Sequence, residues 1–313
     1  MNRIEFGDCR DIMRRWANEG VRVQTCVTSP PYFVLRDYGH PGQIGLEHTP
    51  EEYIAAMVEV FRCVRDVLAD DGTLWLNIGD SYAGYHGNKN AAHDAAPSNK
   101  GGYFENQRKT LVNHNGIKNK DLIGIPWMLA FALRADGWYL RQDIIWHKPN
   151  PMPESVTDRC TKAHEYIFLL SKSERYFFDS EAMREPCSED MRRRAAASHT
   201  RGQGKIDKSR NDATTVRPTQ ITADSRNRRS VWTVATRPYK GAHFATFPPA
   251  LIEPCILAGS RPDDIVLDPF MGSGTTAAVA LQHGRQYLGC ELNREYKPLQ
   301  QERINAAVGP LFA

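Results

Sequence analysis

A glycine-rich loop near the C-terminus has the residue types that bind nucleotide-like ligands. The apolar run Ile265–Leu267 leads into Asp268-Pro-Phe-Met-Gly-Ser-Gly-Thr-Thr276, and an alanine-rich helical pattern follows as far as Gln282. In such a strand, loop and helix, backbone amides and the helix N-terminus face the space above the strand end. Gly272-x-Gly274 lacks the third glycine of the dinucleotide fingerprint, and no lysine precedes the threonines as in a Walker loop. The pattern therefore predicts a binding loop outside those two classes, or a structural loop of the same composition.

A second stretch with chemical potential lies near the N-terminus. Thr28-Ser-Pro-Pro-Tyr32 follows Val21–Val27, a partly alternating apolar run that predicts a strand. Two consecutive prolines can continue neither a sheet interior nor a helix, so the chain must leave the strand end as a rigid, extended loop with an aromatic residue at its tip. A loop that merely turns the chain is the alternative.

Together, the two stretches resemble those of a known enzyme family. The amino-group DNA methyltransferases carry (Asp/Asn/Ser)-Pro-Pro-(Tyr/Phe) as their catalytic loop and Asp-Pro-Phe-x-Gly-Ser-Gly-Thr as their S-adenosylmethionine loop. The order seen here, with the catalytic loop first, is similar to that of the permuted β subclass. The resemblance implies a doubly wound α/β fold, with a mostly parallel sheet and a C-terminal antiparallel edge. It also implies methyl transfer to the amino group of a base in double-stranded DNA.

The resemblance assigns a cofactor role to residues after three predicted strands. The Phe270 ring can face the sulfonium cation of S-adenosyl-L-methionine, and Gly272 and Gly274 allow close approach of the backbone. Glu291 follows Asp268 by 23 residues, at the end of the next strand, where an acid can bind both ribose hydroxyls. Asp8, after the first strand, is expected near the adenine, to cap a helix, or to do both. The expected cofactor-binding residues are Asp8, Asp268, Phe270, Gly272, Ser273, Gly274, Thr275 and Glu291.

The proline loop suits activation of an exocyclic amine. The lone pair of such an amine is delocalised into the base, and hydrogen-bond acceptors on its two N–H groups can draw the nitrogen toward tetrahedral geometry. The Ser29 hydroxyl and the Pro30 carbonyl are suitable acceptors, and Tyr32 can stack on a base flipped out of the duplex. Methylation of cytosine at carbon 5 is excluded because neither Pro-Cys pair, at Cys187 and Cys255, lies in a matching motif. The expected catalytic residues are Ser29, Pro30, Pro31 and Tyr32.

The identity of the methylated base is less clearly indicated. Ser29, in place of the Asp of the commonest adenine pattern, points to cytosine N4. However, Thr-Ser-Pro-Pro-Tyr followed by Leu35-Arg-Asp-Tyr-Gly39 resembles phage-borne and solitary methylases, which often act on adenine, so we favour adenine N6. A protein or RNA methyltransferase is a further alternative, but it usually has Asn first and the unpermuted order. A catalytically silent DNA-binding relative is disfavoured by the intact cofactor loop.

Positive charge is concentrated in one segment of the chain. The net charge of the 313 residues is only +3, but residues 191–230 contain eleven Lys and Arg against three Asp. A disordered basic linker or a DNA-reading segment would both have this composition, and the resemblance favours recognition. Trp146, at the end of a predicted strand, is a candidate wall of the base pocket or a core residue. The expected DNA-contacting residues are Arg36, Trp146, Lys148, Arg192, Arg193 and Arg194.

The remaining pattern divides the chain. Residues 1–82, 121–180 and 231–313 are expected to form one catalytic domain, 83–120 a mobile loop, and 181–230 the recognition segment. Within the catalytic domain, Thr49 and Pro50 predict the start of a long amphipathic helix. Tyr166–Leu170 and Tyr176–Phe178 predict a hairpin, which would offer a surface for the homodimer that the resemblance suggests.

The cysteines and hydropathy exclude other classes of protein. Seven scattered cysteines with no Cys-x-x-Cys argue against a metal site and against a disulfide framework. We expect reduced thiols in a cytoplasmic protein, bacterial or phage-encoded and associated with the nucleoid. No signal peptide precedes the first predicted strand, and no apolar run approaches the roughly 20 residues of a membrane span.

Overall fold

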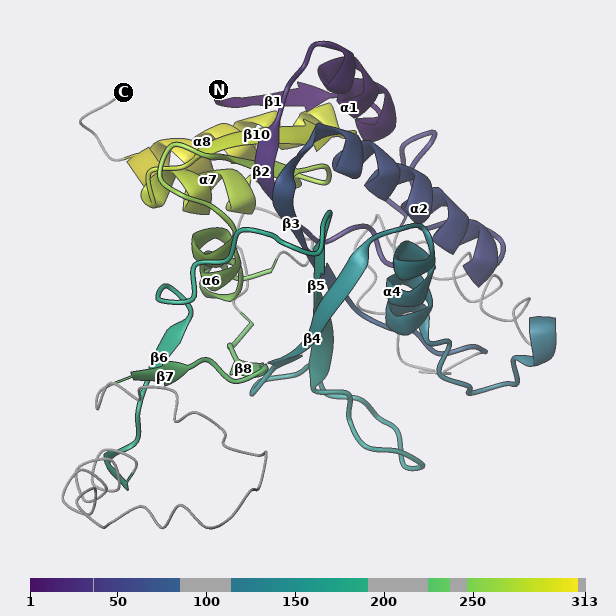
Figure 1. Ribbon diagram of the computed structural model, residues 1–313. Coiled ribbons are helices and arrows are strands. Elements are labelled where there is room, and N and C mark those ends of the chain that lie inside the picture. Colours follow the sequence, from purple (N-terminus) through teal and green to yellow (C-terminus); the bar gives the residue numbers. More distant parts are fainter. Residues whose placement is uncertain (36, 85–113, 191–224, 237–246, 309–313) are drawn as a thin grey trace, which may run out of the picture. The chain divides into compact units, whose positions relative to one another are not determined.

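A computed structural model of the chain describes residues 1–35, 37–84, 114–190, 225–236 and 247–308 (Figure 1). The chain forms two compact units, one comprising Met1–Phe178 and Ser230–Ala313 and the other Asp179–Arg229. No helix in the described ranges is long and apolar enough to cross a membrane.

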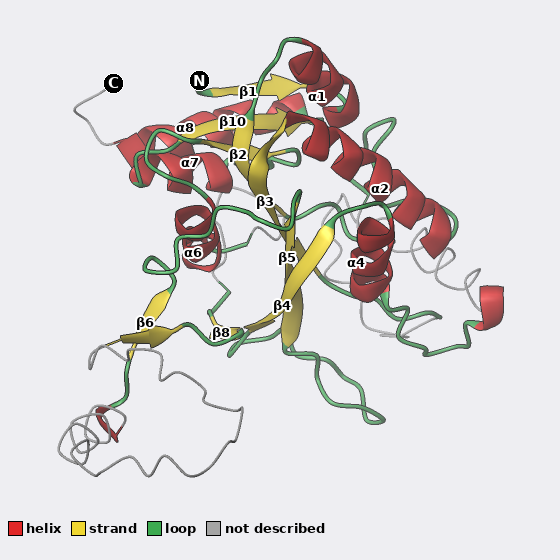
Figure 2. Ribbon diagram, in the orientation of Figure 1, coloured by secondary structure: helices red, strands yellow, loops and turns green. Residues whose placement is uncertain are grey.

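The first unit contains an eight-stranded sheet with helices packed on it (Figure 2). The strand order is β1-β10-β9-β2-β3-β5-β4-β8, and neighbouring strands are parallel except where β5 meets β3 and β4. In sheet order the strands span Arg3–Phe6, Gln286–Glu291, Ile265–Asp268, Val23–Thr28, Leu68–Ile78, His164–Ser171, Tyr139–His147 and Val231–Thr233. The expected mostly parallel α/β fold is confirmed, but its antiparallel strand lies inside the sheet rather than at an edge.

The centre of the sheet is a topological switch point. After β9 the chain passes through α7 to β10 on one side, whereas after β2 it passes through α2 to β3 on the other side. Because β9 and β2 are adjacent and parallel, their carboxyl ends meet at the same edge. Ligands of open α/β sheets bind in the crevice at such a point. The glycine-rich loop and the proline loop are therefore brought side by side by the fold itself.

The α-helices that the structure describes in the first unit form two groups (Figure 1). The helices α1, α2 and α4, of which α2 contacts both others, span Cys9–Asn18, Pro50–Val67 and Ile125–Ala135. The helices α6, α7 and α8, of which α7 contacts both others, span Pro249–Gly259, Thr275–Gln282 and Lys297–Val308. The described residues also include the 3₁₀ helices η1 and η2, which span His114–Gly116 and Arg294–Tyr296. The core between α1, α2, α4 and the sheet includes the fully buried side chains of Trp16, Tyr53, Phe61 and Phe168.

The predicted start of α2 is confirmed. The Thr49 hydroxyl accepts a hydrogen bond from the backbone N–H of Glu52 at 3.2 Å, and the Glu52 carboxylate accepts one from the N–H of Thr49 at 3.3 Å. This reciprocal pair is a capping box, and Pro50 follows it at the first helical position.

The predicted hairpin of Tyr166–Leu170 with Tyr176–Phe178 is wrong. Strand β5 pairs with β3 on one side and β4 on the other, so neither of its edges is free for a third partner. The segment at Tyr176–Phe178 is not a strand and instead covers the β3 region, where the Phe178 ring stacks on Trp75 with centroids 6.3 Å apart. The surface that we expected this hairpin to offer for a homodimer is therefore absent.

The second unit, Asp179–Arg229, contains a two-stranded antiparallel sheet of β6 (Arg184–Pro186) and β7 (Ser225–Asn227). Glu185 accepts hydrogen bonds from Arg226 at 2.8 Å and Arg229 at 2.9 Å, and these cations lower the pKa of its carboxyl against the opposing effect of burial. Most of the basic segment, including Arg192, Arg193 and Arg194, lies outside the described residues, as do most of the predicted mobile loop and Arg36.

Candidate active site

Asp268 connects the two loops at the centre of the sheet. Its Oδ1 accepts hydrogen bonds from the Thr28 hydroxyl at 2.6 Å and from the backbone N–H of Phe270 at 3.0 Å, and its Oδ2 accepts one from the Thr276 hydroxyl at 2.6 Å. The side chain is almost fully buried, and burial raises its pKa to about 6, although the three hydrogen bonds oppose the shift. Asp268 thus fastens the end of β2 to the cofactor loop, and both its oxygens already accept hydrogen bonds within the protein.

Hydrogen bonds from two neighbouring elements fix the backbone of the glycine loop. Gly272 and Gly274 both have left-handed backbone, with φ of 53° and 84°. The N–H of Gly272 donates to Glu291 Oε2 at 2.7 Å, while its carbonyl accepts from Gln300 of α8 at 2.7 Å. A Cβ on Gly274 would lie only 3.3 Å from Gln300 Cα, whereas one on Gly272 would have no neighbour nearer than 3.9 Å. The space beside Gly272 is therefore open, and the space beside Gly274 is filled by α8.

Glu291 lies at the end of β10, beside the loop, as the spacing predicts. Only 9% of the residue is exposed, and its Oε1 accepts a hydrogen bond from the N–H of Asn293 at 2.8 Å. Burial raises the pKa of this carboxyl, while the amides of Asn293 and Gly272 oppose the shift. Each oxygen keeps a further lone pair, which is the capacity that binding of a diol requires.

Two more loop residues differ in their surroundings. The Ser273 hydroxyl is buried and has no hydrogen-bond partner in the part of the chain that the structure describes, which is unusual for a buried polar atom. The Thr275 hydroxyl instead accepts a hydrogen bond from Arg303 of α8. Together with the open space at Gly272, the Ser273 hydroxyl fits a polar ligand lying on the loop.

Asp8 caps α1. Its Oδ1 accepts a hydrogen bond from the backbone N–H of Arg10 at 2.8 Å, and its Oδ2 accepts one from the guanidinium of Arg10 at 2.6 Å. These hydrogen bonds hold the pKa of Asp8 below its usual value. The helix-cap interpretation is confirmed, and contact of Asp8 with adenine stays a prediction.

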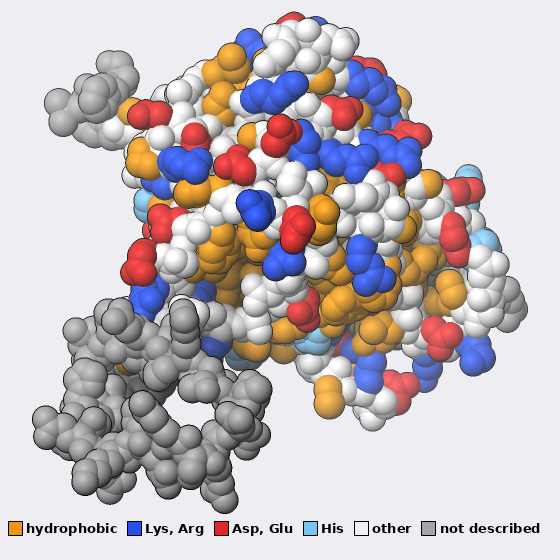
Figure 3. Space-filling view, viewed as in Figure 1, with side chains coloured by type: hydrophobic (Ala, Val, Ile, Leu, Met, Phe, Trp, Pro, Cys, Tyr) orange, Lys and Arg blue, Asp and Glu red, His pale blue; other side chains and the backbone are white. Residues whose placement is uncertain are grey.

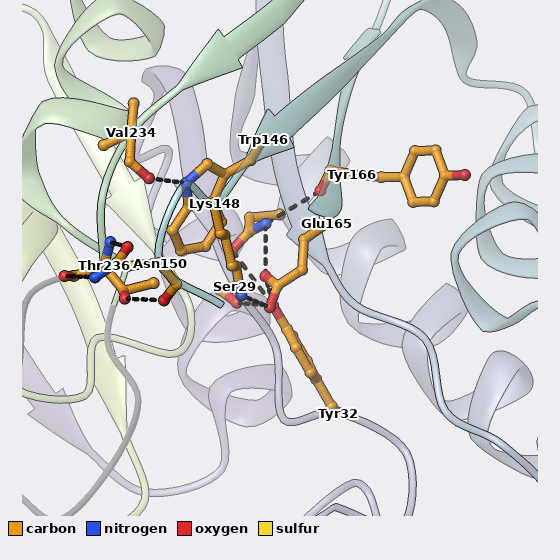
Figure 4. A network of polar contacts seen from close by, with 10 residues as sticks. Ser29, Tyr32, Trp146, Lys148, Asn150, Glu165, Tyr166, Val234 and Thr236 are labelled. Atoms are coloured by element: carbon orange, nitrogen blue, oxygen red, sulfur yellow. Dashed lines mark hydrogen bonds and ion pairs between the residues drawn. The ribbon is translucent and has the colours of Figure 1, made fainter. Parts of the chain in front are cut away.

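The proline loop is fixed by hydrogen bonds to α2 and to β5, and Figure 4 shows the second of these contacts. The Pro31 carbonyl accepts a hydrogen bond from the Tyr53 hydroxyl of α2 at 2.8 Å. The Tyr32 hydroxyl donates to Glu165 Oε2 of β5 at 2.6 Å. The Ser29 hydroxyl lies 3.5 Å from the Tyr32 hydroxyl. Gly79, just after β3, makes room for the Tyr32 ring, because a Cβ there would lie 2.7 Å from Tyr32 Cε2. The loop is therefore preorganised.

Glu165 is the centre of a polar network that the sequence did not reveal. Its carboxylate forms an ion pair with the Lys148 ammonium and accepts a hydrogen bond from Asn77 Nδ2 at 3.3 Å. Lys148 lies 4.3 Å from the centroid of the Trp146 ring. Trp146 is 4% exposed and its indole N–H donates to the carbonyl of Val234 at 2.8 Å, so the core interpretation of Trp146 is the better one. Sequence analysis named Tyr32, Trp146 and Lys148 separately but not Glu165, and Asn77, a polar residue inside a buried strand, is the further signal that could have pointed to this network.

Comparison with known proteins identifies the family. The family model described as DNA methylase, for N6 and N4 methyltransferases, matches residues 23–302. The Type II methyltransferase M.SmaI of Serratia marcescens is 48% identical over 303 residues, covering 96% of this chain and 90% of that protein. M.Cfr9I of Citrobacter freundii, also a Type II methyltransferase, is 46% identical over 302 residues, covering 95% and 86%. The chain belongs to the amino-group DNA methyltransferases.

The fold of this DNA methyltransferase is shared with solved structures. The PvuII DNA methyltransferase, described as cytosine-N4-specific, has a TM-score of 0.61 and 18% identity, covering 97% of this chain and 86% of that one. As a member of the family shown by the family model and by the Type II relatives, the protein is an enzyme that modifies DNA at specific sites, with S-adenosyl-L-methionine as its cofactor. The open Gly272, the buried Ser273 hydroxyl and the Glu291 carboxylate are consistent with that cofactor.

Proposed function

We propose that this DNA methyltransferase activates the exocyclic amine of a flipped base with Ser29 and the Pro30 carbonyl, next to a cofactor held by the glycine loop. The observation that carries the proposal is the hydrogen bond from Thr28 to Asp268, because it fastens the residue before Ser29 to the residue that begins the cofactor loop. When bound, S-adenosyl-L-methionine supplies a methyl group whose bond to sulfur breaks as its bond to nitrogen forms. Gly272, Ser273, Phe270 and Glu291 are the residues that would hold it.

The hydrogen-bond directions at Ser29 suit this role. The Ser29 hydroxyl is oriented to donate toward Tyr32, which leaves its lone pairs for an N–H group of the amine. Burial, followed by the charge of Glu165, raises the pKa of Tyr32 well above its usual value, so the tyrosine stays a neutral donor. Its ring is only partly buried and retains surface for contact with a base.

We propose cytosine N4, rather than the adenine N6 favoured by the sequence, as the methylated amine. The expectation of adenine rested on a likeness to phage-borne and solitary methylases, whereas the relatives at 46–48% identity are named Type II methyltransferases. Because the likeness to solitary methylases no longer supports adenine, the remaining indication is Ser29 in place of Asp, which favours cytosine. The PvuII enzyme, named cytosine-N4-specific, supports only the compatibility of this fold with that acceptor, because 18% identity establishes fold alone.

Product analysis tests the acceptor. DNA methylated by the enzyme is digested to nucleosides and the product identified by mass, with N4-methylcytosine expected. N6-methyladenine alone would overturn the cytosine assignment and leave the amine mechanism standing. Methyl groups on RNA or protein, with none on DNA, would contradict the mechanism as a whole.

Two serine variants separate chemistry from cofactor binding. Ser29→Ala should lower the rate of methyl transfer by an amount corresponding to about 1.5–3 kcal/mol, because the lost hydrogen bond strengthens as the nitrogen becomes cationic. Ser273→Ala, the matched change on the cofactor loop, should weaken cofactor affinity with little effect on the rate at saturation. Equal effects of the two changes on both parameters would contradict the proposed division of roles.

We also propose a homodimer in the cytoplasm. Helices α2 and α4 leave an open groove lined by Ile54, Val58 and Met128, and Phe131 of α4 is 46% exposed. Apolar side chains are also exposed over the region of β4, β5 and α4 in Figure 3. None of the seven cysteines, all of which lie in the described ranges, forms a disulfide, and six are buried, which suits a reducing compartment. Sedimentation at micromolar concentration tests the dimer, and a monomer with and without DNA would contradict it.

A further inference from the structure

A directed chain of hydrogen bonds leads from the catalytic loop to a carboxylate. The Ser29 hydroxyl donates to Tyr32 Oη at 3.5 Å, and Tyr32 Oη donates to Glu165 Oε2 at 2.6 Å (Figure 4). The first distance is long, but hydrogen bonds of catalytic groups commonly shorten when substrate binds. Both donors are therefore directed from Ser29 toward Glu165, whose Oε2 is much nearer to Tyr32 Oη than the alternative acceptor Asn77 Oδ1, at 3.4 Å.

The proposed reaction needs an acceptor for one proton. An exocyclic amine that has gained a methyl group carries a positive charge, and it becomes neutral only by losing a proton. Because its lone pair belongs to the ring system, the charged form is a strong acid and even a weak base can take the proton. Family members with Asp at the first position of the tetrapeptide bring a carboxylate to this place, whereas Ser29 brings only a hydroxyl, which cannot keep a second proton.

We propose that Glu165 is the terminal acceptor of that proton, reached through Ser29 and Tyr32. This inference rests on the proposed contact of Ser29 with the amine. One N–H bond of the methylated, cationic amine breaks and its proton joins Ser29 Oγ. The original Ser29 proton passes to Tyr32 Oη, and the original Tyr32 proton passes to Glu165 Oε2. The products are a neutral methylamino group, unchanged serine and tyrosine hydroxyls, and a protonated Glu165.

The surroundings of Glu165 suit such an acceptor. Its side chain is 15% exposed, so it is shielded from bulk water but retains a route for releasing the proton. The Lys148 ammonium compensates the buried negative charge before the transfer, which makes an ionised carboxylate acceptable at this depth. Asn77 donates to Oε2 at 3.3 Å and to the Tyr166 carbonyl at 3.1 Å, and so holds the receiving oxygen toward Tyr32.

A purely structural role is the competing interpretation. The bond from Tyr32 to Glu165 could serve only to hold the tyrosine ring for contact with the base. In that case, loss of the hydroxyl would weaken capture of DNA, whereas loss of a proton route slows the chemical step after substrates are bound. Single-turnover rates and dissociation constants therefore distinguish the two interpretations.

The test uses Tyr32→Phe, Glu165→Gln and the double variant of the full-length protein. Tyr32→Phe removes only the hydroxyl, and Glu165→Gln keeps the shape of the side chain. Tyr166→Phe is the matched control, since Figure 4 shows its ring directed away from the network. Single-turnover methylation is measured with radiolabelled S-adenosyl-L-methionine and unmethylated genomic DNA, and both dissociation constants are measured separately.

Each single variant should transfer methyl about 100-fold more slowly, which is within the usual range for proton transfer by a positioned group, with both dissociation constants nearly unchanged. The double variant should be no slower than the slower single variant, because a chain broken once conducts no further proton. Tyr166→Phe should retain the parent rate.

An unchanged rate in Tyr32→Phe, or independent and multiplying effects in the double variant, would overturn the relay. If Glu165→Gln fails to fold because Lys148 is left unpaired, Tyr32→Phe alone still decides the outcome. Ser29→Ala tests separately the underlying proposal that Ser29 activates the amine. A slow Ser29→Ala with a normal Tyr32→Phe refutes the relay alone, whereas a normal Ser29→Ala refutes the activation by Ser29 on which the relay rests.

Discussion

At the scale of single residues, the same chemical group has different tasks on adjacent strands. Asp268 and Glu291 are both buried acids at strand ends beside the glycine loop. The Asp268 carboxylate accepts three hydrogen bonds and connects two loops. The Glu291 carboxylate accepts hydrogen bonds from two backbone amides and keeps lone pairs for a ligand. Sequence spacing identified both positions but could not separate these tasks, because the partners Thr28 and Asp268 are 240 residues apart.

The buried Asp268 predicts a pH dependence of stability. Its pKa of about 6 in the folded protein exceeds the ordinary value of 3.8, so the folded state binds the proton more tightly. The resulting stabilisation is complete below about pH 3.8 and is lost as the pH rises through about 6. By linkage it amounts to about 3 kcal/mol.

Comparison with Asp268→Asn isolates that contribution. The unfolding free energy of the parent, relative to that of the variant, should fall by up to about 3 kcal/mol between pH 4 and pH 7 in urea titrations. Parallel pH profiles for the two proteins would show that the carboxyl has no raised pKa in the folded state.

The two loop glycines should respond differently to a methyl group. Gly272→Ala meets open space, so its only folding penalty is the left-handed backbone, about 1 kcal/mol, while the added Cβ intrudes where we place the cofactor. We expect cofactor affinity to fall by about tenfold or more, as measured by calorimetry. Gly274→Ala has the same backbone penalty and also places its Cβ 3.3 Å from Gln300 Cα of α8, so it should lower the unfolding free energy further, by about 1–3 kcal/mol. The reverse ranking of the two variants in stability would contradict this account.

At the scale of elements, local signals were predictable and strand partners were not. Proline restricts the backbone and glycine permits left-handed backbone in any context, so both loops and the start of α2 could be predicted directly from the sequence. The place of β5 between β3 and β4 could not, because pairing is decided by contacts between distant segments. The same reason hid Glu165, whose partner Tyr32 is 133 residues away and whose own neighbourhood is an ordinary apolar strand.

The capping box of α2 stabilises the start of the helix and, through Tyr53, the position of the proline loop. Thr49→Ala removes the side-chain acceptor for the Glu52 amide and should lower the unfolding free energy by about 1 kcal/mol. Because Tyr53, in the first turn, donates to Pro31, fraying of this end should also slow methyl transfer modestly. Thr49→Ser, which keeps the hydroxyl, serves as the control in urea unfolding and activity assays. If Thr49→Ser loses as much stability as Thr49→Ala, the cap is not the cause.

At the scale of the whole molecule, charge and catalysis are separated along the chain. Residues 191–230 carry a local charge of +8, so the rest of the chain, with the sheet and both loops, is net negative. Because a net-negative unit offers no overall electrostatic attraction to DNA, we expect the basic segment to supply most of the long-range attraction. The composition of the basic segment does not reveal which Lys or Arg side chains contact phosphates, because such contacts require only a positive charge and a side chain long enough to approach the DNA backbone.

The salt dependence of DNA binding tests this assignment. Each phosphate contact by a cation on duplex DNA contributes about 0.9 to the slope of log affinity against log salt. Replacing Arg192, Arg193 and Arg194 together by Gln should therefore weaken binding and flatten that slope by up to about 2.7.

The control replaces Arg22, Lys172 and Arg261 together by Gln. They match the first set in charge, but they lie at the sheet edge opposite Ser29, where β2 and β9 begin and β5 ends. Titrations between 50 and 200 mM salt, a range over which about ten contacts change affinity by several orders of magnitude, should move the first slope and leave the second at the parent value. Equal flattening by both triple variants would mean that DNA responds only to total charge, and an unchanged slope in the first would make the segment a solvated linker.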